Sequence, residues 1–167
     1  MILTLHYLIE KIVPIHGVAD NGDGSYRVDY INEPDLDKLE QVNNILSSWP
    51  LEKAKIEKLE QLDQEWANTI KKGWITPYGW KLGLSTEDIA LLNGNFTLAK
   101  EAASMGLNSP VFVIDTDEES HEFNLQDLTV LMLQYGQARA TLSAQDAVKR
   151  KSIQHATNMN ELDNITI

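Results

Sequence analysis

The chain has 167 residues, of which 43% are hydrophobic and 23% charged, values typical of a globular rather than a disordered protein. This length allows one ordinary domain or one domain with an appendage, and we expect the second. The net charge of -11 repels phosphate backbones and anionic lipid surfaces, so we expect neither a nucleic-acid partner nor membrane insertion. The absence of cysteine excludes disulfides, thiolate metal sites and thiol catalysis.

The N-terminal stretch predicts a β-hairpin. Residues 2–18 are rich in Ile, Leu, Val and Tyr and contain Pro14, which favours extended structure at a sheet edge. Turn-forming residues follow at 20–25, and residues 26–30 alternate aromatic or apolar side chains with charged ones. The apolar residues predicted to dock this hairpin on a neighbouring protein are Ile12, Val13, Ile15, Val18, Tyr26, Val28 and Tyr30.

A first helix is expected to follow the hairpin, from Pro34 to about Ser48, and to end at Trp49-Pro50. One hairpin and one helix bury too little apolar surface to be stable alone, since two-stranded hairpins are marginal in water. Residues 1–49 are therefore predicted to be a docking arm that needs the surface of another segment or chain.

A second, longer helix is predicted between Pro50 and Gly73, because proline is accepted in a first helical turn and glycine commonly ends a helix. Residues 50–72 would connect the arm to the rest of the chain. The apolar stripe of this helix is narrow, which suits either packing on its own C-terminal domain or a coiled-coil seam between copies of the chain. The predicted oligomerisation seam consists of Ile56, Leu59, Leu62, Trp66 and Ile70.

Residues 73–167 predict a compact domain in which short hairpins alternate with helices. Apolar residues flank a Pro-Tyr-Gly turn in 74–84, and a second apolar run, 111–114, leads through an acidic turn to a return strand. Helices with polar N-caps follow each hairpin. The expected fold class is α+β, with an N-terminal β-hairpin arm, a long connecting helix, and a C-terminal domain of two short antiparallel hairpins packed on helices.

The sequence carries no recognisable catalytic motif. The four histidines lie far apart and without metal-site spacing, and no phosphate-binding loop or nucleophile elbow is present. His121 lies near the carboxylates of residues 115–119, but an acidic hairpin turn is usually solvated. We therefore expect no enzyme activity, no catalytic or metal-binding residues and no cofactor.

Two stretches resemble proteins encoded in phage tail gene clusters. The N-terminal sequence IVPIHGVADNGDGSYRVDYI is similar to the opening of small proteins from these clusters. The C-terminal part resembles an uncharacterised domain family found in phage tail fibre and tail-fibre-assembly genes. The segments that carry this second resemblance are Ile70-Lys71-Lys72-Gly73-Trp74, Asn93 to Ala103, Val111 to Phe123, and Ala156 to Leu162.

The resemblance implies a structural component of a phage tail, in the fibre or baseplate, with residues 1–49 docking on a neighbouring tail protein. Its expected partners are other tail or baseplate proteins and further copies of itself, with a trimer favoured. Its expected location is the virion, after synthesis in the host cytoplasm. An alternative stays open, in which the chain is a tail-fibre assembly chaperone that is absent from the finished particle.

Overall fold

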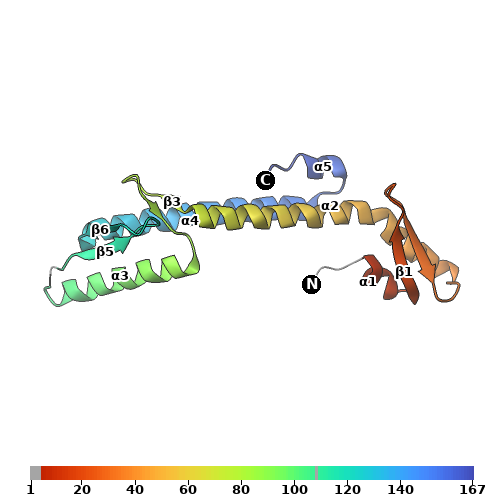
Figure 1. Cartoon of the computed structure of the whole chain (residues 1–167), viewed down its shortest axis with the longest axis horizontal. Coiled ribbons are helices and arrows are strands. Elements are labelled where there is room, and N and C mark those ends of the chain that lie inside the picture. The colour runs from red at the N-terminus through yellow and green to blue at the C-terminus, as the bar shows by residue number, and fades with distance from the viewer. Residues whose placement is uncertain (1–4, 108) are drawn as a thin grey trace. The chain divides into compact units, whose positions relative to one another are not determined.

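The computed structural model describes residues 5–107 and 109–167, and its contacts divide the chain into two units. Of the described residues, the first unit contains 5–59 and 153–165, and the second contains 60–107, 109–152 and 166–167. Helices predominate, and each of the short two-stranded sheets is antiparallel (Figure 1). The predicted α+β fold class is confirmed.

The first unit contains the predicted N-terminal hairpin. Strands β1 (Ile15–Asp20) and β2 (Tyr26–Tyr30) pair antiparallel, with Val18 opposite Val28. At the tip, the carboxylates of Asp20 and Asp23 accept hydrogen bonds from nearby backbone N–H groups. This polar tip is a self-contained turn, as turn-forming Asp and Gly residues predict.

A short helix, α1 (Leu5–Glu10), precedes the hairpin. The prediction of extended structure over 2–18 is therefore wrong for these residues, while residues 1–4 lie outside the described part. Leu5 and Ile9 are four positions apart and both buried, which is the spacing of one helix face. The strand prediction is correct from Ile15 onward.

The predicted helices on either side of Pro50 are one continuous helix, α2 (Leu36–Lys72). The predicted helix end at Trp49-Pro50 is therefore wrong. Proline in a helix interior costs about 3 kcal/mol, because it removes a backbone donor and clashes with the preceding turn. Four residues just before it belong to the core of the first unit, and their burial offsets this cost: Val42, Ile45, Leu46 and Trp49.

The division of the chain differs from the predicted boundaries at 49/50 and 72/73. Residues 60–72 of α2 belong to the second unit, and residues 153–165 belong to the first. The last of these contain α5 (Met159–Asp163), which is capped by Asn158. Lys58 donates a hydrogen bond of 2.6 Å to the Leu162 carbonyl, tying α5 to α2 within the first unit. That residues 1–49 are not stable alone and that residues 73–167 form a compact domain both stay predictions.

The second unit contains two hairpins, each followed by a helix. In chain order the elements are β3 (Trp74–Ile75), β4 (Lys81–Leu82), α3 (Thr86–Ser104), β5 (Val111–Ile114), β6 (Ser120–Phe123) and α4 (Leu125–His155). Only residues 125–152 of α4 belong to this unit. Ser85 and Asp88 form the predicted capping box at the start of α3. Asn124 accepts a hydrogen bond from the Asp127 N–H at the start of α4, also as predicted.

One hydrophobic core joins both hairpins of the second unit to α3 and α4. Its buried members are Leu82, Leu84, Leu92, Ala99, Val113, Phe123, Leu128, Leu131 and Tyr135. The Tyr135 hydroxyl donates a 2.8 Å hydrogen bond to the Gly83 carbonyl, which satisfies its polar group inside the core. The core thereby fixes the hairpins that carry the candidate site.

Candidate functional site

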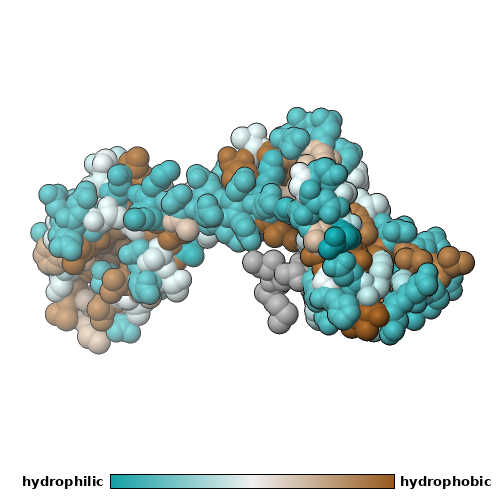
Figure 2. Space-filling model, turned by 45° about the vertical axis from the view of Figure 1, so that its right-hand side comes forward, coloured by the Kyte–Doolittle hydropathy of each residue, from teal (hydrophilic) through white to brown (hydrophobic). Residues whose placement is uncertain are grey.

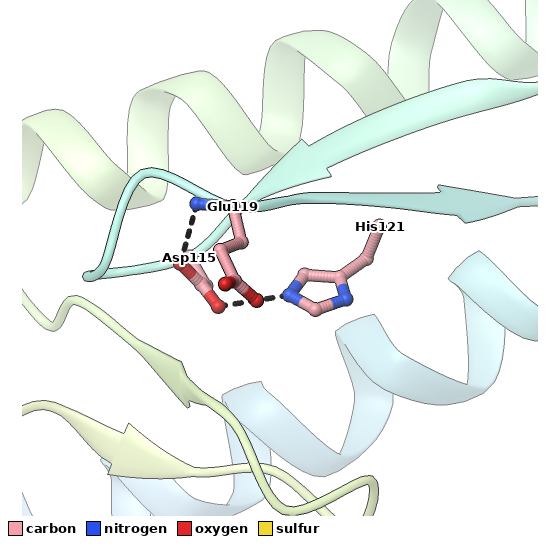
Figure 3. Close-up of side chains that lie close together, drawn as sticks. All are labelled: Asp115, Glu119 and His121. Atoms are coloured by element: carbon pink, nitrogen blue, oxygen red, sulfur yellow. Dashed lines mark hydrogen bonds and ion pairs between the residues drawn. The ribbon is translucent and has the colours of Figure 1, made fainter.

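The turn between β5 and β6 brings together the only cluster of carboxylate and imidazole groups with metal-like spacing in the described part of the chain. It consists of Asp115, Glu119 and His121, whose ligand atoms all lie within 4.8 Å of one another (Figure 3). Asp115 directly follows β5, Glu119 belongs to the turn, and His121 lies in β6. We consider this cluster the candidate site.

The hairpin register explains the convergence. Val113 lies opposite His121, and the Asp115 N–H donates to the Glu119 carbonyl, so the turn is tight. Glu118 adopts a positive φ of 64°, which closes the turn. One Asp115 carboxylate oxygen accepts the backbone N–H groups of Asp117 and Glu119 at 2.8 and 2.9 Å. The carboxylate is therefore part of the turn itself.

The other carboxylate oxygen of Asp115 lies 2.8 Å from His121 Nε2, so a proton on that nitrogen is donated to Asp115 (Figure 3). The His121 ring is parallel to the Trp80 indole, with ring centroids 4.1 Å apart. Trp80 comes from the other hairpin and also stacks on Tyr78. The aromatic contact and the hydrogen bond together fix the imidazole ring.

A backbone hydrogen bond joins the two hairpins at the same place. The Thr116 N–H donates to the Lys81 carbonyl at 3.0 Å, directly beside the Trp80 indole that covers His121. The site therefore connects the β3–β4 hairpin to the β5–β6 hairpin. Within the second unit, the cluster therefore lies where the two hairpins are held together.

The acidic turn is solvent-exposed as expected, except at Asp115. The Asp115 side chain is only 2% exposed, whereas Asp117, Glu118 and Glu119 are exposed. The hydrogen bond from His121 holds the pKa of Asp115 below its usual value; burial opposes this, and the backbone N–H groups of Glu119 and Asp117 add to the lowering. Asp115 is therefore a buried, ionised carboxylate whose charge is balanced by donors.

The bonding of the cluster restricts its chemistry. A general base needs an imidazole nitrogen within reach of the proton it removes; His121 Nε2 faces Asp115, so Nδ1 is the nitrogen that could act as a base, on a ring whose face Trp80 covers. A divalent cation at this point would have to replace the hydrogen bond between Asp115 and His121, leaving exposed Glu119 as the third ligand. The arrangement favours a structural role.

The predicted seam residues lie on α2, where the same chain already covers much of them. Leu62 is buried, and Ile56, Leu59, Trp66 and Ile70 are half-buried. Leu62 and Trp66 line a hollow with Leu142 and Asp146 of α4, and Asp63 pairs with Arg150 at 2.7 Å. This is the predicted alternative in which the helix packs on its own domain, while association between copies stays a prediction.

The predicted docking residues lie together in the core of the first unit. Val13 and Ile15 are buried, and the other five pack against this core: Ile12, Val18, Tyr26, Val28 and Tyr30. Their contacts are with residues of α1 and the first part of α2. Docking of this hairpin on a neighbouring protein stays a prediction.

Sequence reasoning missed the part that Trp80 plays in the site. Trp80 and His121 are 41 positions apart, and neither a periodicity nor a short motif links them. The one local signal was the stretch 115–119, since Asp at the start of a tight turn commonly accepts backbone N–H groups. That signal predicts the turn but not the buried carboxylate.

The Asp115 carboxylate is expected to make stability depend on pH. Because its folded pKa lies below the ordinary 3.8, the charged form stabilises the fold at neutral pH, and this contribution is lost as the pH falls through the lowered value. Asp115→Asn should therefore be less stable than the wild type at neutral pH, with a difference that shrinks in acid. Urea unfolding across this pH range measures it, and a difference independent of pH would contradict the assignment.

Comparison with known proteins adds no family. Neither the family models, nor the curated proteins, nor the solved structures give a match to the chain. Among the helices of the described residues, none combines the length and apolar character needed to cross a membrane.

Proposed function

We propose that the chain is a non-enzymatic structural component of a phage tail, in the fibre or the baseplate. The first unit would dock on a neighbouring tail protein, and the second would be exposed. The observation that carries the non-enzymatic part is the engagement of Asp115 and His121 with each other, with the turn and with Trp80. These contacts give both side chains a role in holding the turn and the two hairpins together.

The tail assignment is supported by the sequence resemblance described above, which extends over both units. Two of the segments that carry this resemblance, the one around Gly73 and residues 156–162, contain residues that end or cap helices in this chain. Gly73 has a positive φ of 72° directly after α2, and Asn158 caps α5. A resemblance built on caps and turns supports a shared structural role rather than a shared reaction.

The proposal includes association of the chain with copies of itself, with a trimer favoured by the resemblance. The seam residues are partly covered within one chain, so a trimer would use the faces of Ile56, Leu59 and Trp66 that stay accessible. The exposed faces of these residues would form only a small interface, whereas the interfaces of obligate oligomers are usually larger. Light scattering on the full chain measures the oligomeric state.

The composition of purified particles tests the proposed function. If the chain is a structural component, its peptides should remain when particles from the phage that encodes it are purified through a density gradient and analysed by mass spectrometry. Peptides found in the lysate but lost from the particles would instead identify an assembly chaperone. The major tail proteins in the same sample provide the internal control.

A further inference from the structure

The second unit contains a groove beside the candidate site, with Asp115 common to both. It runs between α3 and the outer edge of β5 and has a volume of about 240 Å³. Small-molecule pockets usually have volumes of roughly 300–1,000 Å³, so a few side chains suit this groove better than a compact ligand. Its lining includes Asp88, Leu91 and Asn95 of α3 and Phe112, Ile114 and Asp115 of the β5–β6 hairpin.

The edge of β5 offers unpaired backbone groups to this groove. In an antiparallel pair, residues that exchange hydrogen bonds alternate with residues whose polar groups point away. The Asp115 N–H bonds to the Glu119 carbonyl, so Asp115 belongs to the set of β5 residues that pair with β6. The backbone polar groups of the alternate residues Phe112 and Ile114 therefore point away from β6. Asn95 donates to the Phe112 carbonyl at 3.0 Å, whereas no described residue pairs with the N–H or C=O of Ile114.

Apolar side chains lie on both sides of this edge. Leu91 of α3 is 68% exposed, and Ile114 of β5 is 65% exposed. Phe112 is exposed beside them, and Leu98 continues the apolar surface along α3. Figure 2 shows hydrophobic surface on the part of the molecule that contains these elements. An exposed apolar strand edge is the feature that natural proteins usually cover or protect with charge.

The charge around the groove is negative. Asp88 and Asp115 are the ionisable residues among those that line it, and both carboxylates already accept hydrogen bonds within the chain. Asp117 and Glu118 are exposed at the turn that follows β5. Because the whole chain carries -11, a bound segment with Lys or Arg near this turn gains favourable electrostatics, and a second copy of the chain meets repulsion.

We propose that this groove binds an extended segment of a different protein, which pairs with the edge of β5 as an added strand. Alternate apolar side chains of the segment would contact Leu91, Phe112 and Ile114, and its Lys or Arg would lie beside the acidic turn. A helix does not satisfy the Ile114 backbone groups, because its own are paired internally. The identity of the partner as a tail protein rests on the proposed function, whereas the binding mode does not.

The test uses peptides selected from a random library on the immobilised full chain. The selected peptides should alternate apolar residues and carry Lys or Arg at one end. Ile114→Pro removes the outward N–H, a change that strand edges tolerate, and should weaken binding of the enriched peptide about tenfold. Leu133→Ser changes a similarly exposed leucine on α4 outside the groove and should leave the affinity unchanged. Fluorescence anisotropy measures each affinity, and added salt should weaken binding.

Several outcomes would overturn this proposal. The first is a selection that yields no binding peptides, and the second is a peptide affinity that Ile114→Pro leaves unchanged. The third is self-association of the wild-type chain that Ile114→Pro abolishes, because this result would assign the groove to a second copy of the chain. If Ile114→Pro does not fold by circular dichroism, Leu91→Ser on the helix wall replaces it with the same expectation. Peptide binding in a chain that purified particles lack would contradict the proposed function and leave the groove proposal intact.

Discussion

Replacing Leu62 with alanine should lower the free energy of unfolding of the second unit by about 2–5 kcal/mol, the usual cost of truncating a buried leucine. The Leu62 side chain lies on α2 and is only 3% exposed. Trp66, Leu142 and Asp146 line the same hollow, and the Asp63–Arg150 ion pair lies beside it. Truncation leaves a cavity where α2 meets α4. Urea unfolding of the full chain measures the loss.

Leu133→Ala provides the matched control. Leu133 is 70% exposed on α4 of the same unit, and surface substitutions usually change stability by less than about 0.5 kcal/mol. Light scattering on both variants adds a second readout. If Leu62→Ala leaves the unfolding curve unchanged but dissociates an oligomer, Leu62 belongs to an intermolecular seam and its assigned packing on α4 is incorrect.

Gly73→Ala should cost about 2 kcal/mol or more, for two separate reasons. Gly73 has a φ of 72°, a left-handed conformation that costs other residues about 1–2 kcal/mol. A Cβ at this position would also lie 2.6 Å from the Leu82 carbonyl oxygen, which belongs to the pairing of β3 with β4. Thermal unfolding should show the loss as a lower midpoint.

Gly94→Ala is expected to stabilise the protein, in contrast to Gly73→Ala. Gly94 lies inside α3, and a Cβ there would meet nothing within 4 Å, so alanine should stabilise the helix by about 0.5–1 kcal/mol. The pair of variants separates backbone strain from a general effect of adding a methyl group. Equal stability changes in the two variants would contradict the assigned conformation of Gly73.

Elements fixed by neighbouring residues could be predicted from the sequence. The capping box of Ser85 and Asp88, the Gly73 cap and the hairpin between β1 and β2 all depend on contacts within a few positions, and the structure contains each. The errors have longer-range causes. Pro50 predicts a helix boundary by its local cost, but burial of residues before it keeps α2 continuous.

The candidate site could be predicted only in part, for the same reason. The acidic turn at 115–119 was visible in the sequence, whereas the burial of Asp115 depends on partners across two hairpins. His121 faces Asp115 because of the strand register, and Trp80 stacks on His121 next to the Thr116–Lys81 bond that joins the two hairpins. A single sequence contains no local pattern that reports such tertiary contacts.

The number of copies of the chain in each purified particle is the decisive measurement of a structural role in the tail. Isotope-labelled reference peptides from both units allow this number to be measured by mass spectrometry against the major tail proteins. We expect a constant copy number that persists through gradient purification and a high-salt wash. A chain that is abundant in the lysate but absent from the particles, or present in amounts that vary with washing, would contradict a structural role in the tail.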